Sequence, residues 1–223
     1  METYNVKIMS TGLITRDVLQ IFTEKPAGLV FRPGQAVDVS INREGWQDEK
    51  RPFTFTSLPD DDFLQFTIKT YPADKGVTNE LLRLRRNDSL FISEVFGAIE
   101  YRNEGYFIAG GAGITPFISI LRYLKSENSI GSNKLIYANK TRDDIILKYE
   151  FERLLGKNFV NILSEEAAKG YAHGYLNRDF LRKQLTDLTK DIYLCGPEPM
   201  MEAVEKILSD LNIDDSQIIK EAV

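Results

Sequence analysis

The sequence predicts two domains, an antiparallel β-barrel or sandwich followed by an α/β domain with a parallel sheet. Strand-like segments fill residues 1–98 almost alone, whereas apolar runs alternate with amphipathic helices from about residue 105 onward. The chain has 223 residues, which is enough for two cores of about 100 residues each. The boundary is expected at residues 100–104, which gives domains of 1–100 and 101–223.

The expected strands of the first domain alternate apolar and polar side chains and are rich in β-branched and aromatic residues. Clusters of Gly, Pro, Asn or Asp separate them, as in antiparallel sheets with short connections. A helix is expected to begin at residues 76–78, because Leu81, Leu82 and Arg85 follow with helical spacing. The predicted strands are 4–10, 18–22, 35–41, 53–56, 63–69 and 89–93.

The second domain is expected to be Rossmann-like, because strands alternate with helices around residues 117–124, 149–155, 180–185 and 201–211. Its predicted strands are 106–109, 135–138, 159–163, 192–195 and 218–219. Ligands of such sheets bind outside the carboxyl ends of the strands. The segments expected at that edge are 110–116, 139–142, 164–166, 195–200 and 221–223.

Composition argues against several classes of function. The net charge of −5 opposes a large nucleic-acid surface, and no apolar run approaches the roughly 20 residues that span a bilayer. No signal peptide is visible at the start of the sequence, so a cytoplasmic location is expected. The protein is also expected to be a monomer. A single cysteine and a single histidine argue against an internal disulfide, an iron–sulfur cluster and a His-rich metal site. No metal is therefore expected, and redox chemistry would need an organic cofactor.

Two loops of the second domain have the composition of nucleotide-binding turns. Residues 110–116 form a glycine-rich turn from strand to helix, with Thr115 expected as the N-cap and Pro116 as the first helical residue. The third glycine of the usual fingerprint is absent, so an ordinary tight turn is the alternative. Residues 195–200 also join a strand to a helix, and their alternative is a turn around a buried thiol.

Two segments of the first domain carry similar signals. Arg51–Ser57 combines a cation, aromatic rings and hydroxyls, which suit a phosphate, a flavin ring and its nitrogens. Strand alternation places Arg51, Phe53 and Phe55 on one face, although an ordinary edge strand would look the same. Residues 76–78 offer a helix N-terminus and a hydroxyl to a pyrophosphate, and plain helix capping is the alternative.

Taken in order, these segments resemble the ferredoxin–NADP(H) reductase superfamily, of the flavodoxin/ferredoxin reductase type without an iron–sulfur domain. The matching motifs are Arg-Pro-aromatic-Ser/Thr at 51–54, Gly-x-Thr at 76–78, Gly-Gly-x-Gly-Ile-Thr-Pro at 110–116 and Cys-Gly-Pro-x-Pro-Met at 195–200, with Pro-Gly-Gln at 33–35. They cover nearly the whole chain. The family fold, an antiparallel flavin barrel followed by a nucleotide domain, agrees with the pattern of expected elements.

The resemblance implies roles for individual residues and a bound FAD, with FMN as an alternative. Arg51 would bind the flavin phosphate, Phe53 would stack on the isoalloxazine and Thr54 would bond near its N5, although the family usually has Tyr and Ser at the last two positions. Cys195 would lie beside the reacting carbon of NADH or NADPH. Hydride transfer needs no general acid or base, so Thr54, Cys195 and Glu221 are only the best catalytic candidates. The other implied cofactor contacts are Pro52, Lys69, Thr70, Tyr71, Gly76, Val77, Thr78, Gly111, Gly113, Thr115, Arg142, Ser164, Gly196, Pro197 and Met200.

The implied function is an NAD(P)H oxidoreductase that passes electrons through FAD to a flavodoxin or ferredoxin. A reductase of free flavin or ferric chelates, and a non-catalytic flavin-binding subunit of a larger complex, stay open as alternatives. NADH is expected to serve at least as well as NADPH, because Glu165 and Glu166 follow Ser164 and would repel a 2′-phosphate, although Arg142 argues the other way.

Two further expectations concern the chain end and the histidine. In many relatives an aromatic residue ends the chain and covers the flavin, whereas this sequence ends Glu221-Ala222-Val223, so Val223 is expected to leave the flavin open. The alternative is that these residues only finish the last strand and fray. His173 lies in a predicted His-Gly-Tyr turn and is interpreted as structural.

Overall fold

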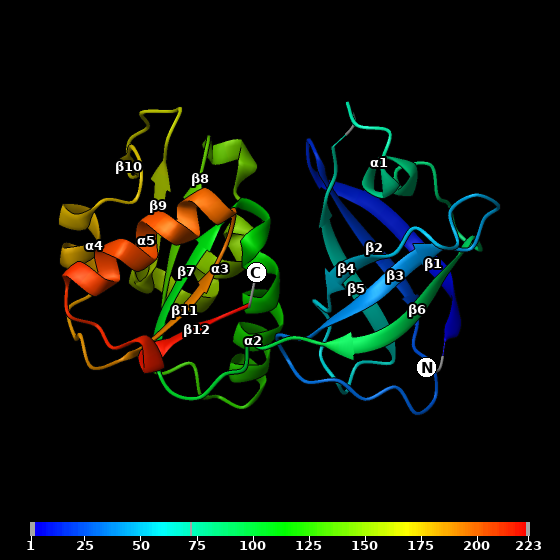
Figure 1. Ribbon diagram of the computed structural model, residues 1–223, viewed down its shortest axis with the longest axis horizontal. Coiled ribbons are helices and arrows are strands. Elements are labelled where there is room, and N and C mark those ends of the chain that lie inside the picture. The colour runs from blue at the N-terminus through cyan, green and yellow to red at the C-terminus, as the bar shows by residue number, and fades with distance from the viewer. Residues whose placement is uncertain (1–2, 72, 222–223) are drawn as a thin grey trace.

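The computed structural model describes residues 3–71 and 73–221, and it contains two sheets (Figure 1). The first is antiparallel and the second is parallel, which confirms the predicted fold class. The first sheet consists of β1 (Tyr4–Thr15), β2 (Val18–Glu24), β3 (Ala36–Ile41), β4 (Arg51–Thr54), β5 (Phe63–Lys69) and β6 (Ser89–Phe96).

The antiparallel sheet closes into a barrel. Its strand order is β4-β3-β6-β1-β2-β5, so β4 and β5 are its two edges. Just after β4 ends, Phe55 forms an antiparallel bridge with Phe66 of β5, and this pairing joins the edges. The two rings lie 5.5 Å apart between centroids inside the barrel core. Closure removes the exposed edges that an open antiparallel sheet would present to other chains.

The helix of the first domain is shorter than its sequence pattern suggested. The helix α1 spans only Val77–Leu81, with Gly76 as an N-cap in extended backbone, and the chain leaves it in a turn after Leu82. Val77, Leu81 and Leu84 are all buried in the barrel core. The apolar spacing therefore reflects one helical turn and a following turn that both cover the barrel end.

The second sheet is parallel throughout and has the order β10-β9-β8-β7-β11-β12. Each predicted strand is present, and the two-residue β10 was not predicted from the sequence. The strands are β7 (Gly105–Gly110), β8 (Lys134–Asn139), β9 (Phe159–Leu163), β10 (Ala172–His173), β11 (Asp191–Cys195) and β12 (Ile218–Lys220). The α-helices described in this domain are α2 (Thr115–Ser126), α3 (Lys148–Leu155), α4 (Arg178–Gln184) and α5 (Glu198–Asp210). Its short 3₁₀ helices are η1 (Gly111–Ile114), η2 (Arg142–Asp144), η3 (Gly156–Asn158) and η4 (Asp215–Gln217).

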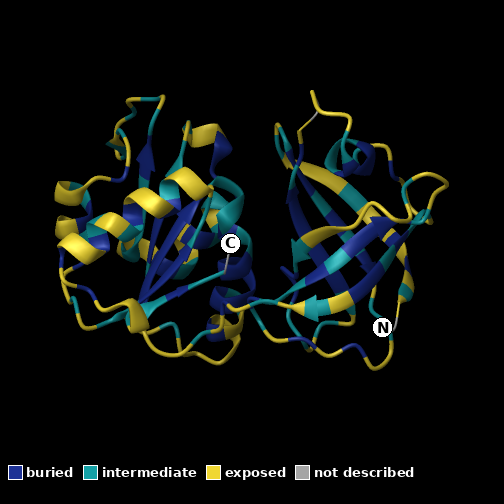
Figure 2. Ribbon diagram, in the orientation of Figure 1, coloured by how far each residue is buried: buried dark blue, intermediate teal, exposed yellow. Residues whose placement is uncertain are grey.

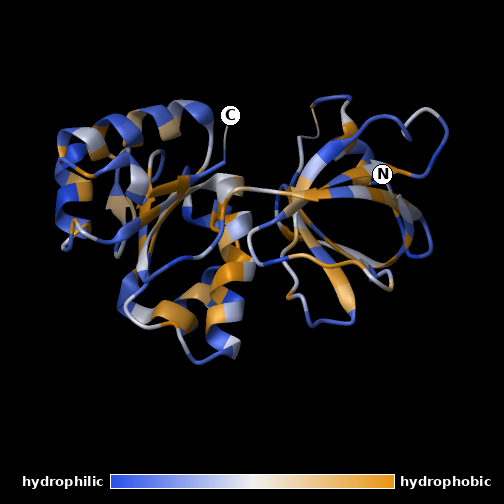
Figure 3. Cartoon of the chain, turned by 60° about the horizontal axis from the view of Figure 1, so that its bottom comes forward, coloured by the Kyte–Doolittle hydropathy of each residue, from blue (hydrophilic) through white to orange (hydrophobic). Residues whose placement is uncertain are grey.

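Helices cover both faces of the parallel sheet, which explains why its strands are continuous apolar runs. In β7, Phe107 packs with α2 and α3 in one core, whereas Tyr106 and Ile108 pack with α4 and α5 in the other. Figure 2 shows the buried strands between helices whose outer surfaces are exposed. Figure 3 shows the same division as hydrophobic colour along the sheet and α2. Among the described residues, none of the helices has both the length and the apolar character to cross a bilayer.

The strand order locates the expected ligand crevice. The chain runs outward from β7 to β8 and β9, then returns to the other side of β7 as β11. A doubly wound sheet binds its ligands where the order reverses, outside the carboxyl ends of the two strands concerned. Here those ends are Gly110 of β7 and Cys195 of β11. The two motifs predicted for nucleotide binding therefore begin at the switch point.

Candidate active site between the two domains

The glycine-rich loop leads from β7 into α2 through one turn of 3₁₀ helix. Gly111–Ile114 form η1, and α2 begins at Thr115 with Ile114 as its N-cap. The prediction that Thr115 is the N-cap is wrong, because η1 already supplies helical backbone before it and the Thr115 hydroxyl makes no capping bond. Thr115 Oγ1 instead donates to Thr54 Oγ1 of the barrel, 3.3 Å away. This threonine pair joins the predicted flavin and nucleotide segments.

Close packing explains why the loop contains glycine at residue 113. A Cβ atom built on Gly113 would collide with the backbone carbonyl of Cys195, the last residue of β11. A Cβ on Gly110 would collide with the Met200 side chain in the same way. The Tyr137 hydroxyl of β8 supports the loop from below by donating to the Gly111 carbonyl at 2.8 Å. The two glycine-containing motifs thus form one packed unit at the switch point.

Cys195 and Glu221 lie at the carboxyl ends of adjacent strands. Glu221 follows β12, and both of its carboxylate oxygens accept from the Ala98 backbone N–H at 3.2 Å. Burial and, to a smaller extent, the negative charge of Glu221 raise the pKa of the Cys195 thiol to about 12. Cys195 is therefore a neutral thiol at physiological pH, available for contact and for a weak hydrogen bond rather than as a nucleophile.

The barrel segment 51–55 is partly as expected. Arg51 is half exposed, and its guanidinium pairs with Glu49 at 3.3 Å and donates to the Lys50 carbonyl at 2.6 Å. Phe53 is half-buried at the margin of the barrel core. Phe55 is fully buried and stacks on Phe31 with centroids 4.1 Å apart, so it is a core residue. The shared face predicted for Arg51, Phe53 and Phe55 thus runs from solvent into the core.

The segment that follows β5 is anchored to the turn between β1 and β2. Lys69 Nζ pairs with the Asp17 carboxylate at 2.6 Å, and the Thr70 N–H and hydroxyl both donate to the Asp17 carbonyl. Tyr71 is exposed beside them. The Gly76–Thr78 backbone forms the start of α1, and no side chain caps it. The backbone at Lys69 and Thr70 is therefore fixed, the Tyr71 ring beside it is exposed, and the N-terminus of α1 has no side-chain cap.

The loops after β8 and β9 neutralise one another. Arg142 pairs with Glu166 through its Nε at 3.0 Å and also donates its backbone N–H to that carboxylate. Lys140 pairs with Glu165 at 3.0 Å. Ser164 lies between these loops, with its N–H bonded to the Asn139 carbonyl. The acidic and basic residues that pointed to opposite nucleotides in the sequence are thus ion-paired partners.

His173 is close to the same loop. The structure places it in β10 rather than in a turn, and its Nδ1 lies 3.1 Å from the Glu166 carbonyl. Its side chain is exposed, and within the described part of the chain its hydrogen-bond partner is this backbone carbonyl. Among the described residues, no group of three or more His, Cys, Asp or Glu side chains could hold a metal ion.

The donor set and the open backbone fit a flavin and a nicotinamide dinucleotide. A Cβ built on Gly76 or on Gly111 would meet no atom within 4 Å, so the space in front of both backbone segments is free. Gly111 has a φ of +50°, a left-handed conformation that glycine adopts without strain. Backbone N–H groups at such positions can approach a phosphate closely. The open space is common to both predicted phosphate-binding turns, whereas the left-handed backbone is found at Gly111 and Gly76 is extended.

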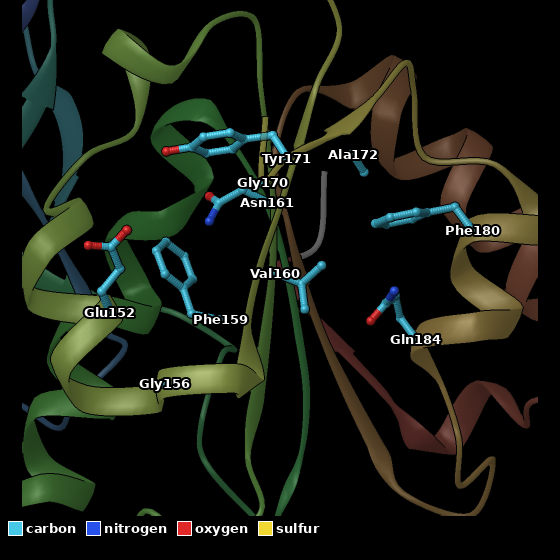
Figure 4. Close-up of a pocket in the computed structure, with 10 residues that line it drawn as sticks. All are labelled: Glu152, Gly156, Phe159, Val160, Asn161, Gly170, Tyr171, Ala172, Phe180 and Gln184. Carbon is cyan, nitrogen blue, oxygen red and sulfur yellow. The ribbon is translucent and has the colours of Figure 1, made fainter. Parts of the chain in front are cut away.

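A separate hollow lies at the edge of the parallel sheet, away from the switch point (Figure 4). Phe159 and Asn161 project on the α3 side of β9, and Val160 projects on the α4 side. The Asn161 Oδ1 atom is buried and lacks a hydrogen-bond partner among the described residues. The hollow is lined by Glu152, Gly156, Phe159, Val160, Asn161, Gly170, Tyr171, Ala172, Phe180 and Gln184. None of these is a predicted site residue.

Sequence reasoning missed several residues that complete the candidate site. Ala98 binds Glu221, and Gly34 of the barrel donates its buried N–H to Ser119 of α2 at 3.0 Å. Arg122, also on α2, contacts both domains. Their contacts join segments that are distant in the sequence. Ala98 and Arg122 lie outside the motifs identified above, and Gly34 lies in the Pro-Gly-Gln motif at 33–35, to which no contact with the second domain was assigned. The predictions for Val223 and Ala222 fall outside the described residues.

Two known families match separate parts of the chain. The profile of an FAD-binding domain family matches residues 3–103, and that of the oxidoreductase NAD-binding domain family matches residues 107–206. The chain is 31% identical over 213 residues to NADH-cytochrome b5 reductase 2 of Mycosarcoma maydis, covering 84% of this chain and 60% of that protein. It is also 31% identical over 214 residues to the glycine betaine monooxygenase reductase subunit of Pseudomonas aeruginosa, covering 89% and 58%.

Solved structures show the same architecture. The CS-b5R domains of human Ncb5or superpose with a TM-score of 0.87 at 25% identity, covering 99% of this chain and 70% of that one. A ferredoxin NADP+ reductase from Neisseria gonorrhoeae with bound FAD and NADP superposes with a TM-score of 0.84 at 17% identity, covering 99% and 98%. At that identity the second likeness shows the fold alone. The two curated relatives are longer proteins, of which this chain spans about three fifths.

Proposed function

Because this chain belongs to the ferredoxin–NADP(H) reductase superfamily of FAD- and NAD-binding oxidoreductases, we propose that it oxidises NADH and passes the electrons singly to a small redox protein. Residues 1–100 would hold FAD and residues 101–223 the nicotinamide nucleotide. When bound, FAD would supply the redox chemistry that links the two-electron hydride of NADH, which is oxidised to NAD+, to an acceptor of single electrons.

One observation carries this proposal. The hydroxyls of Thr54 and Thr115 are in hydrogen-bond contact at 3.3 Å. Thr54 ends the strand β4 in the predicted flavin segment, and Thr115 begins the helix α2 in the predicted nucleotide segment. The contact lies at the switch point, where a dinucleotide is expected. Two cofactor sites on separate domains are useful for hydride transfer only where they meet, since reacting atoms must approach to about 3–3.5 Å.

The side chains around this contact would bind and orient rather than exchange protons. Arg51 would clamp a flavin phosphate, Phe53 would cover one face of the ring and Thr54 would donate to or accept from its edge. Cys195, held as a neutral thiol, would border the nicotinamide without bringing a charge that disfavours one redox state. The carboxylate of Glu221 stays fixed by Ala98.

The other proposed contacts hold the rest of the two cofactors. Gly76, Val77 and Thr78 would bind the flavin pyrophosphate beside Pro52, Lys69, Thr70 and Tyr71, and Gly111, Gly113, Arg142, Ser164, Gly196, Pro197 and Met200 would line the nucleotide. The ion pair between Arg142 and Glu166 occupies the cation that a 2′-phosphate would need, and this supports NADH as the preferred nucleotide. An unesterified ribose can hydrogen-bond to the same carboxylate.

The acceptor is proposed by class. The two curated relatives described above are named as a reductase of cytochrome b5 and as a monooxygenase reductase subunit, so their names point to different redox partners. The narrower expectation of a flavodoxin or ferredoxin has no specific support from them. What these partners share is that each is a protein that takes up electrons from a reductase. We therefore propose a small protein that takes up single electrons as the acceptor.

The test is anaerobic reduction of the purified protein. The proposal expects a yellow protein whose flavin spectrum bleaches with NADH and returns when cytochrome b5 or a ferredoxin is added. No bleaching with either NADH or NADPH would refute it and would favour a non-catalytic flavin-binding subunit. Faster reoxidation by free FMN or a ferric chelate than by any redox protein would favour the alternative reductase.

A further inference from the structure

One face of α2 forms a polar seam with the barrel. Thr115, Ser119 and Arg122 have the spacing of residues on the same side of a helix. Each contacts a different part of the barrel: Thr115 meets Thr54, Ser119 accepts from the Gly34 N–H, and Arg122 reaches the β4–β5 region. The same helix that begins at the candidate active site is thus attached to the other domain along roughly two turns.

Arg122 makes the most contacts in this seam. Its Nη1 donates to the Thr56 carbonyl at 2.7 Å and to the Gln65 Oε1 at 2.6 Å, both in the barrel. Its Nε and Nη2 donate to the two carboxylate oxygens of Glu150 on α3, at 2.6 and 2.8 Å. The side chains of Arg122 and Glu150 are only 23% and 29% exposed, so water screens this pair less than a surface pair.

The barrel acceptors are themselves fixed relative to Thr54. Thr56 follows Thr54 by two residues along the chain, and its N–H and hydroxyl both donate to the Gln65 carbonyl. The Gln65 N–H in turn donates to the Ser57 hydroxyl at 3.0 Å. A change in the position of Arg122 relative to these groups therefore changes the position of Thr115 relative to Thr54.

We propose that Arg122 is a positioning residue for hydride transfer, which sets the two cofactor sites at reacting distance by binding Glu150 and the barrel with one guanidinium. This inference rests on the proposed function. It depends on the fork of arginine, because a lysine ammonium is a compact group that cannot hold a carboxylate with two parallel bonds and also reach two barrel acceptors. No catalytic contact with substrate is assigned to Arg122.

The experiment compares Arg122→Met, Arg122→Lys and Gln65→Leu with the wild-type holoenzyme. Gln65→Leu removes only a barrel acceptor and leaves the pair with Glu150, so it tests the interdomain half of the contact. Arg153→Met is the matched control, because Arg153 is exposed on the same helix as Glu150. Stopped-flow reduction at saturating NADH should slow about 10- to 100-fold in Arg122→Met, with the apparent Kd for NADH and the flavin content nearly unchanged.

Hydrogen exchange gives a readout that does not depend on turnover. Exchange of the Gly34 amide, which donates across the seam to Ser119, should accelerate in Arg122→Met and Gln65→Leu but not in Arg153→Met. Arg122→Lys should restore little of the rate. Unchanged reduction rates and unchanged Gly34 exchange in all Arg122 variants would overturn the inference. Failure of NADH to reduce the wild-type protein would instead refute the proposed function.

Discussion

The protonation state of Cys195 can be tested directly, because it is the only cysteine in the chain. Burial and the neighbouring Glu221 carboxylate raise its pKa from the ordinary 9.0 to about 12. Thiol reagents attack the thiolate, so the reaction rate follows the ionised fraction. At pH 8 that fraction is about 10⁻¹ for an ordinary thiol and about 10⁻⁴ for a thiol of pKa 12. Alkylation of the native protein should therefore be about 10³-fold slower than that of the unfolded chain.

The pH dependence separates this effect from simple shielding of the sulfur. Shielding lowers the rate equally at every pH, whereas a raised pKa makes the rate climb tenfold per unit up to about pH 11. Iodoacetamide kinetics followed by mass spectrometry at several pH values, with a urea-unfolded sample as reference, measures both. Glu221→Gln should raise the native rate modestly, because it removes the smaller of the two causes. A native rate that levels off near pH 9 would refute the reasoning.

The same pKa change makes a prediction about stability. The folded state holds the Cys195 thiol proton more tightly than the unfolded state, so this proton contributes to the free energy of unfolding. The contribution is fully present below about pH 9 and is lost between about pH 9 and pH 12. At pH 10 the loss amounts to about 1.4 kcal/mol. Urea unfolding of the wild type and of Cys195→Ala between pH 7 and pH 10 should show this extra loss in the wild type alone.

Three further predictions concern the cofactor sites. Arg51→Ala should weaken FAD binding about tenfold, measured by flavin retention, because one charge-assisted bond to a phosphate is lost; full retention would show that this segment does not bind the flavin. Wild-type kcat/KM should not favour NADPH by tenfold, and Glu166→Ala should shift it toward NADPH because Arg142 is released from its ion pair; no shift would separate this pair from nucleotide choice. Gly113→Ala should lower the unfolding free energy by about 1–3 kcal/mol, since its Cβ would collide with the Cys195 carbonyl; an unchanged Tm would contradict that packing.

The fold could be predicted because its two halves differ in local periodicity. Two-residue alternation in the first domain and helix–strand alternation in the second are properties of short windows, and the structure has strands and helices at those positions. Element ends were less predictable. The pairing of β10 with β9 and the early end of α1 depend on tertiary contacts, which short windows do not contain.

The site could be predicted where a motif has a backbone reason, and not where partners come from the other domain. Glycine is required at residue 113 because a Cβ atom there would collide with the backbone of Cys195 and Gly196, so its motif was visible in the sequence. The hydroxyl of Thr115 was expected to cap its own helix, but the barrel offers Thr54 as a partner instead. Likewise, Arg142 was interpreted as favouring NADPH and Glu166 as favouring NADH, but the two side chains form an ion pair with each other. Local reasoning assigns such groups to local partners by default.

The sequence does contain one signal for the interdomain seam, although it is easily mistaken for ordinary core. A helix on the surface of a sheet buries one stripe, whereas α2 has apolar residues at every position from Pro116 to Leu121 except Ser119, and all six are buried. Burial all around means that a second body covers the outer face, and that body is the barrel, which contributes Val18 to the same core. A polar residue within such a helix needs a partner there. Ser119 accepts a hydrogen bond from the Gly34 N–H, and Arg122 donates to the Thr56 carbonyl and to the Gln65 side chain. The polar positions of a helix buried on all sides therefore indicate where one domain holds the other.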